Sequence, residues 1–106
     1  MYGLKSKTIK AIQKVFAEHP VIESVILYGS RAKGNYRNGS DIDITLIGEM
    51  LTLSEQFQIE TKLDDLLLPY KIDLSIYHKI ENSDLKEHIN RVGKVFYKKQ
   101  EDILDE

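Results

Sequence analysis

The sequence predicts an α/β protein of the α+β type, in which a small mixed β-sheet has helices packed on one face. Short runs rich in valine and isoleucine, typical of strands, alternate with longer segments whose apolar residues recur at helical spacing. At 106 residues the chain is long enough for one core and one domain. We assign residues 1–97 to this domain and residues 98–106 to a charged C-terminal tail.

The first elements are a helix and a strand. Pro20 limits the helix, and residues 21–28 then form a strand that stops at Gly29. Residues 30–40 are polar and glycine-containing, which predicts a short helical turn followed by a loop. The helix is indicated by residues at spacings of three and four: Leu4, Thr8, Ala11, Ile12, Val15 and Phe16.

A second strand and a second helix follow. Residues 41–47 have the composition of a strand. The four residues from Thr52 to Glu55 have the form of a capping box, which predicts that a helix begins there. Pro69 helps to end this helix. Its apolar stripe continues at Ile59, Leu63, Leu66 and Leu67.

The last third of the chain completes the order helix, strand, strand, helix, strand, helix. Residues 71–77 form the third strand. Ser83 is the expected cap of a final helix that ends at Gly93. Residues 95–97 are an apolar patch that suits either a short strand or a helical turn.

Composition excludes several classes of protein. A net charge of -2 provides no general attraction to nucleic acid, so direct nucleic-acid binding is not expected. With no cysteine, neither a disulfide nor a thiolate metal site is available. The N-terminus lacks the apolar stretch of a signal peptide, and the apolar runs are far shorter than the roughly 20 residues that span a bilayer. We therefore expect a cytoplasmic protein without a membrane segment.

Three aspartates are the most informative residues. Asp41 and Asp43 are two apart in one predicted strand, so they share a face, and Asp73 occupies the polar face of another. The neighbours of Asp43 and Asp73 are isoleucine and leucine, and an unpartnered charge inside such a strand is expensive. If the two strands are adjacent, the three carboxylates converge.

Converging carboxylates repel each other unless a cation neutralises them. Hard oxygen ligands suit Mg²⁺ or Mn²⁺, and two such ions favour in-line displacement at a phosphoryl group. In this arrangement Asp41 and Asp43 hold the metal on the nucleotide side. Asp73 completes the second metal site and helps to remove the proton of the acceptor. We therefore predict these three residues as both catalytic and metal-binding.

The turn after the first strand suits a triphosphate. Gly29 lets a phosphate approach the backbone closely, and Ser30 adds a hydroxyl donor at the start of a short helix. Arg31 and Lys33 supply cations nearby. We predict these four residues as the nucleotide-binding set.

Structural alternatives to these site assignments stay open. The turn at Gly29 can be an ordinary end of a strand. Asp43 and Asp73 can be paired with Lys71 or Arg31, and the cations can belong to a solvated loop. The three histidines are isolated and are interpreted as surface or helix-end residues.

Taken together, the motifs resemble a known family. The sequence resembles the DNA polymerase beta-type nucleotidyltransferase superfamily in one pattern. Gly29-Ser30 is followed after ten residues by Asp41-Ile42-Asp43, and a later strand carries Asp73. The short length and the form G-S-R-A-K-G resemble its minimal nucleotidyltransferases. Those proteins are commonly one half of a pair whose other half is a small helical HEPN-domain protein. The resemblance covers roughly residues 5–97.

The resemblance implies a polymerase beta-like fold and transfer of a nucleoside monophosphate, usually from ATP, to an acceptor hydroxyl. In the paired systems it implies an antitoxin that adenylylates a tyrosine of its HEPN-domain toxin. By position, Gly29 and Ser30 match the triphosphate-binding turn, and Asp41, Asp43 and Asp73 match the metal ligands. Lys33 stands where an arginine is common, which keeps the charge but loses the bidentate fork.

Two other functions remain open at this stage. The chain can be a non-catalytic antitoxin or regulatory subunit that acts by complex formation, or a nucleotidyltransferase acting on a small molecule. Intact motif carboxylates favour the enzyme over the binding module. The absence of a separate acceptor-binding lobe in 106 residues argues against the small molecule and predicts that a partner chain presents the acceptor.

Overall fold

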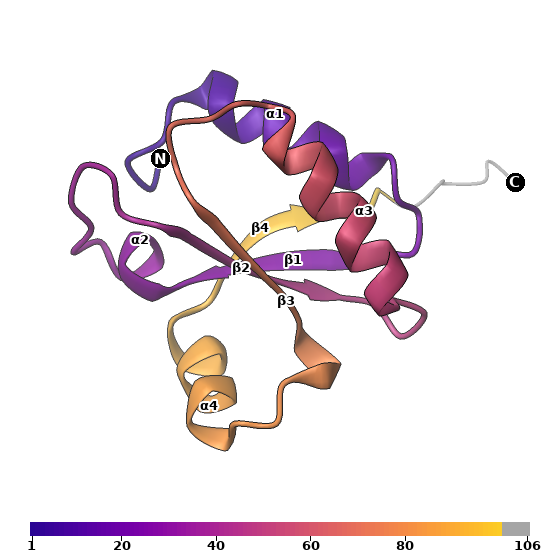
Figure 1. Ribbon diagram of the computed structural model, residues 1–106. Helices are drawn as coiled ribbons and strands as arrows, with labels where there is room; N and C mark the ends of the chain where they lie inside the picture. Colours follow the sequence, from indigo (N-terminus) through magenta and orange to yellow (C-terminus); the bar gives the residue numbers. More distant parts are fainter. Residues whose placement is uncertain (101–106) are drawn as a thin grey trace, which may run out of the picture.

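The computed structural model describes residues 1–100 and shows a four-stranded sheet with helices on both sides (Figure 1). In chain order the elements are α1 (Ser6–Ala17), β1 (Ser24–Tyr28), α2 (Gly29–Lys33), β2 (Ile42–Ile47), α3 (Leu53–Asp64), β3 (Ile72–Ile76), the 3₁₀ turn η1 (Tyr77–Lys79), α4 (Ser83–Val92) and β4 (Lys94–Lys98).

The sheet is mixed, as the sequence predicts. Its strand order is β3-β2-β1-β4. The central strand β1 pairs antiparallel with β2 and with β4, whereas β2 and β3 pair in parallel. A parallel pair requires a crossover connection, and α3 supplies it. Of the two alternatives for residues 95–97, the strand is correct, because these residues lie in β4 at the edge beside β1.

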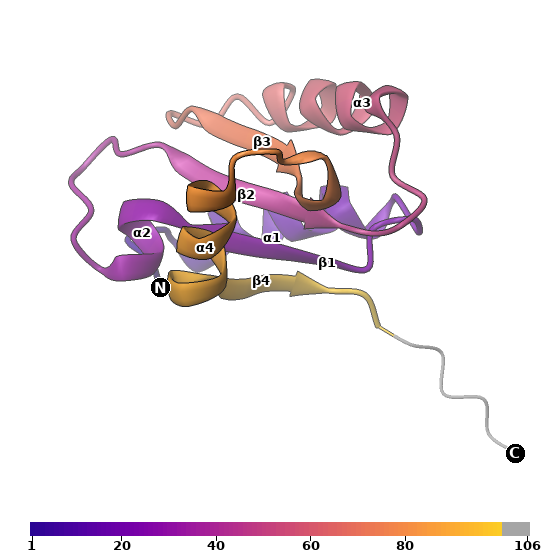
Figure 2. The same cartoon turned by 90° about the horizontal axis from the view of Figure 1, so that it is seen from below.

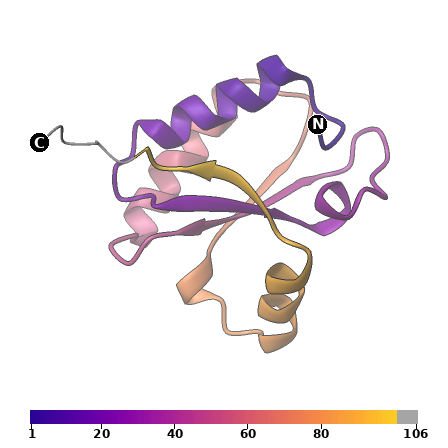
Figure 3. The same ribbon diagram turned by 180° about the vertical axis from the view of Figure 1, so that it is seen from behind.

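Helices α1 and α3 lie side by side over one face of the sheet and enclose the main core (Figure 3). On β1 and β2, alternate residues point into this core, so that Val25, Leu27, Ile44 and Leu46 are 0% exposed. Phe16 of α1 is also fully buried and packs against the rings of Phe96 and Tyr97. Each such side chain contributes roughly 1.5–3 kcal/mol of transfer free energy.

The fold class is confirmed, but one part of the prediction is wrong: the helices do not all lie on one face. Helix α4 packs on the face opposite to α1 and α3 (Figures 1 and 2). Ile89 is the buried residue of this helix, and Gly93 at its C-cap lies against Ile26 of β1. The side chain of Ile26 points away from the main core, so α4 contacts the far side of β1. Thr45, the neighbour of Ile26 on β2, is 0% exposed although it belongs to the polar face. The amphipathic pattern of α4 shows that one side of the helix is buried, but not against which face of the sheet.

Boundaries differ from the predictions by a few residues. The first strand begins at Ser24, and Asp41 lies just before β2. The side chain of Thr52 accepts a hydrogen bond from the Glu55 amide at 3.2 Å, which confirms the predicted start of α3. This helix ends at Asp64, before Pro69, and Leu67 has a φ of +54°.

The final helix is capped one residue earlier than predicted. Asn82, not Ser83, accepts hydrogen bonds from the amides of Asp84 and Leu85. Its C-terminal residue is Val92, with Gly93 as the C-cap, as expected. Of the predicted tail, residues 101–106 lie outside the described residues. Within residues 1–100, no helix has both the length and the apolar character needed to cross a membrane.

Replacing Phe16 by alanine should lower the free energy of unfolding by about 3–5 kcal/mol, because the cavity would lie between α1 and β4. The control is Phe57→Ala, since Phe57 is 64% exposed and its loss should change stability by less than about 0.5 kcal/mol. Urea denaturation of both variants measures the difference. Equal losses would show that the core is not where the structure places it.

Candidate active site

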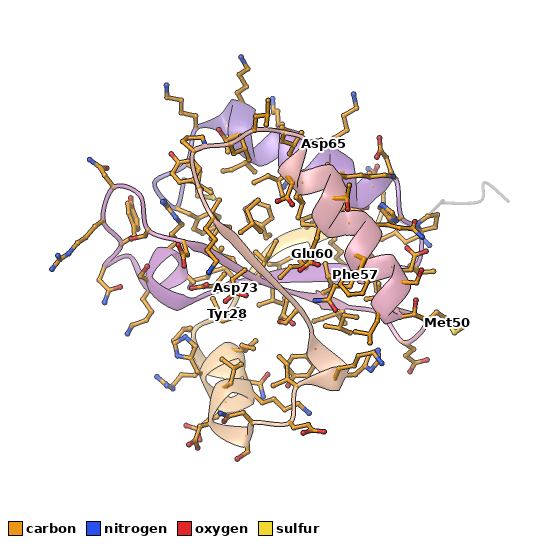
Figure 4. All side chains as sticks on the ribbon, viewed as in Figure 1. Tyr28, Met50, Phe57, Glu60, Asp65 and Asp73 are labelled. Carbon is orange, nitrogen blue, oxygen red and sulfur yellow. The ribbon has the colours of Figure 1, made fainter. Side chains whose placement is uncertain are left out.

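Asp43 and Asp73 lie side by side on neighbouring strands. They are register partners in the parallel pairing of β2 with β3, so the predicted adjacency of these strands is confirmed. Buried Ile42, Ile44 and Leu74 point to the core side, which places the two carboxylates on the opposite face. This is the face on which α4 packs, and Figure 4 shows Asp73 near Tyr28 at the level of the sheet.

Asp41 belongs to the same electrostatic group. Burial raises the pKa of Asp43, and the negative charges of Asp73 and then Asp41 raise it further. Coulombic interactions with His88 and Lys71 partly oppose this increase. Asp41 and Asp73 are both exposed, whereas Asp43 is half-buried between them and the sheet. The charges of Asp41 and Asp73 therefore both act on Asp43.

Within residues 1–100, no cation forms an ion pair with these carboxylates. The ion pairs found there join His19 to Glu55 and Lys62 to Glu18, so neither Lys71 nor Arg31 pairs with an aspartate of the site. In the same residues, no three carboxylate or imidazole groups form a ready-made set of metal ligands.

The chemistry of the aspartates nevertheless fits a divalent cation. The donors are hard oxygens, the charge on Asp43 is opposed by its own neighbours, and the outer two carboxylates are exposed to solvent. Binding of Mg²⁺ or Mn²⁺ would remove the repulsion that raises the pKa of Asp43.

Gly29 is required at the first residue of α2 for two reasons. Its φ of +74° lies in the left-handed region that favours glycine. A Cβ atom at this position would also collide with the Oδ2 atom of Asp43. The backbone of the turn thus runs directly against a carboxylate of the site, and Ser30 follows as the second residue of the helix.

Two residues of the site were not predicted from the sequence. Tyr28 ends β1 as the register partner of Asp43, and burial, together with the charges of Asp73 and Asp43, raises the pKa of its hydroxyl. His88 of α4 packs edge-on against the Tyr28 ring, with the ring centroids 6.0 Å apart. Its Nε2 atom accepts a hydrogen bond from the Gly29 amide at 3.3 Å. The signal was present, because His88 lies on the apolar stripe of its helix formed by Leu85, Ile89 and Val92.

The structure does not place Arg31 among the groups available to a nucleotide. Arg31 is only 2% exposed, and its guanidinium donates to the carbonyl oxygens of Ser40 and Tyr2. Its predicted phosphate contact is therefore corrected to a contact with the protein's own backbone. Lys33, at the end of α2, is exposed.

Comparison with known proteins agrees with this geometry. The family model described as polymerase beta nucleotidyltransferase matches residues 10–102. The chain belongs to this family. Two relatives from Methanocaldococcus jannaschii are named as candidate protein adenylyltransferases. One is 31% identical over 91 residues, which cover 78% of this chain and 92% of the relative. The other is 35% identical over 75 residues, which cover 68% and 76%.

Solved structures share the fold of this nucleotidyltransferase. A chain from a toxin–antitoxin crystal structure with AMP-PNP superimposes with a TM-score of 0.70 at 23% identity, covering 87% of this chain and 74% of that one. A chain from a complex of the tri-AMPylated Shewanella oneidensis HEPN toxin with its MNT antitoxin gives a TM-score of 0.66 at 20% identity, covering 92% and 75%.

Asp43→Asn should raise the melting temperature of the metal-free nucleotidyltransferase at pH 7. A carboxyl group whose pKa is raised in the folded state contributes stability below its unfolded-state pKa and loses it as the pH rises through the folded value. Since asparagine cannot ionise, the difference between variant and wild type should vanish below about pH 4. Thermal melts across this pH range test it. A variant less stable than wild type at pH 7 would contradict the repulsion described here.

Gly29→Ala should abolish most activity, because the new Cβ displaces the Asp43 carboxylate in addition to straining the backbone by roughly 1–2 kcal/mol. Gly34→Ala is the matched control. Gly34 also has a left-handed φ, +90°, but a Cβ there would meet no atom within 4 Å. Both variants should lose stability in thermal melts, and only Gly29→Ala should lose nucleotidyl transfer. Equal activity of the two variants would remove the proposed role of this close contact.

Proposed function

We propose that this protein moves AMP from ATP to a hydroxyl group of a partner protein, a HEPN-domain toxin, and so acts as its antitoxin. The observation that carries the proposal is the register of Asp43 with Asp73, beside Asp41 and against the glycine turn. The names of the relatives support protein adenylylation as the reaction, and the toxin–antitoxin structures of the same fold support the class of partner.

The residues of the site divide the chemistry among them. Asp41, Asp43 and Asp73 would hold the Mg²⁺ or Mn²⁺ ions, for which we propose two positions. Bound there, the ions would neutralise the triphosphate and favour in-line attack. Gly29, through its amide, and Ser30, through its hydroxyl, are proposed as donors to the phosphates, with Lys33 as the nearby cation.

The acceptor side is open to solvent. Asp73 is exposed at the edge strand β3, where a hydroxyl group of another protein can reach its carboxylate. We assign it the removal of the acceptor proton. Because the Gly29 amide donates to His88, a phosphate that takes this amide must displace or share the bond with the imidazole.

The electrostatics favour an enzyme over a non-catalytic antitoxin. A half-buried Asp43 that is repelled by Asp73 and Asp41, with no ion pair to any cation in residues 1–100, lowers the stability of the metal-free fold. A protein that acts only by binding its partner gains nothing from this cost. A catalytic site gains a place for cations.

The test is transfer of labelled AMP from ATP to the proposed partner, a small helical HEPN-domain protein, in the presence of Mg²⁺. Asp41→Asn should reduce transfer by at least about 100-fold, since it removes a charge that neutralises the cation. The matched control is Asp65→Asn, which makes the same change at the C-cap of α3, on the other side of the sheet (Figure 4). The control should label its partner as wild type does.

Two results would decide against the proposal. If both aspartate variants and the wild type neutralise the partner equally and without label, the protein is a binding antitoxin. If no complex with the partner forms and label passes to a small-molecule hydroxyl instead, the acceptor class is wrong.

A further inference from the structure

Arg31 is a buried charge with no carboxylate partner. It is 2% exposed, and neither ion pair found in residues 1–100 includes it. Two tyrosine rings flank its guanidinium, with the Cζ atom 5.4 Å from the centroid of Tyr36 and 4.9 Å from that of Tyr70. Burying a guanidinium in this way is costly unless its N–H groups are bonded. Its bonds therefore indicate what the residue does.

The guanidinium is aimed at one carbonyl group. Its Nε and Nη2 atoms donate to the Ser40 oxygen at 3.1 and 2.8 Å, and its Nη1 atom donates to the Tyr2 oxygen at 2.9 Å. Two donors of a planar fork on one oxygen fix that oxygen in direction as well as in distance.

The Ser40 carbonyl is half of the peptide group that leads into Asp41. On the other side of Asp41, the Ile42 amide donates to the Lys71 oxygen at 2.9 Å, at the start of the pairing between β2 and β3. Asp41 itself is exposed, and none of the hydrogen bonds found in residues 1–100 involves its carboxylate. Its place beside Asp43 is thus set by the two peptide groups that flank it.

Without Arg31, little else would hold this position. Residues 34–39 between α2 and Ser40 are all exposed, and they include Gly34 and Gly39 with left-handed φ values. A turn closes locally, because the Ser40 amide donates to the Arg37 oxygen and the Ser40 hydroxyl accepts from the Arg37 amide. Those bonds shape the turn, whereas the bonds from Arg31 tie it to α2 and the N-terminal segment.

We propose that Arg31 is a positioning residue: by holding the Ser40 carbonyl, it keeps the Asp41 carboxylate beside Asp43, where both can bind the cation. This inference deepens the proposed function and rests on its metal-dependent site. A lysine at position 31 keeps the positive charge but cannot place two donors on one oxygen.

The test measures Mg²⁺ binding apart from activity. Thermal melts of the full chain with a fixed concentration of ATP are recorded as Mg²⁺ is varied, and the half-saturating concentration is read from the rise in melting temperature. Arg31→Lys should raise this concentration about tenfold or more, as is usual when a group that orients a metal ligand is lost. Arg37→Lys is the matched control in the same loop, and since the Arg37 side chain is exposed it should leave the value unchanged.

A double-variant comparison separates positioning from loop stability. If Arg31 acts through Asp41, adding Arg31→Lys to Asp41→Asn should not weaken Mg²⁺ binding further. Arg31→Gln, which keeps one amide donor, replaces the lysine variant if the latter does not fold. The inference would be overturned if a position-31 variant needed no more Mg²⁺ than wild type, even with a lowered melting temperature. It would also be overturned if the losses of Mg²⁺ binding caused by the two substitutions were additive in the double variant.

The two proposals fail in different ways. If Mg²⁺ binding depends on Arg31 through Asp41 but the partner receives no AMP, the acceptor and the antitoxin role are wrong and the positioning role stands. If the partner is labelled and Arg31→Lys binds Mg²⁺ as wild type does, the positioning role is wrong and the proposed function stands.

Discussion

The parallel pairing of β2 with β3 is the constraint on which the site depends. In that pairing Asp43 lies opposite Asp73 on the neighbouring strand. The positions of the two residues are therefore set by the positions of their strands. The pairing is itself held by the core, because Ile44 and Leu74 lie on the opposite face of the same strands beneath α3. A slip of one residue would exchange the two faces, which would put a carboxylate into the core and an isoleucine into the site. One register therefore holds both the core residues and the pair of aspartates in place.

The site combines repulsion with tight packing. Asp43 carries a raised pKa because it is half-buried and is repelled by two other carboxylates, and it lies where a Cβ atom at position 29 would collide with it. In a metal-free protein this arrangement costs stability. The same arrangement makes the site receptive to a cation, because binding then removes a repulsion in addition to forming new bonds.

Helix α4 changes the character of the polar face. On this face Thr45 and Tyr28 are buried and Asp43 is half-buried, with α4 packed against β1 and η1 against β2. Helix α4 also brings His88 to the Gly29 amide, from 59 residues away in the sequence. The face that carries the acidic residues is thus partly covered near the glycine turn and exposed at Asp73, and the proposed function places the nucleotide at the covered end and the acceptor at the exposed one.

By itself, the sequence determined the fold class and the acidic face, because both follow from local periodicity: alternation along a strand places Asp43 and Asp73 opposite their apolar neighbours, and helical spacing marks α1, α3 and α4. The turn at Gly29 was also visible, because a glycine and a serine directly follow an apolar run in the sequence. Only the tertiary structure decided which face each helix covers, that His88 reaches the turn, and that Arg31 points toward Ser40 instead of toward solvent. Those outcomes depend on contacts between residues far apart in the chain, and a local pattern records that a side chain is buried without recording its neighbours.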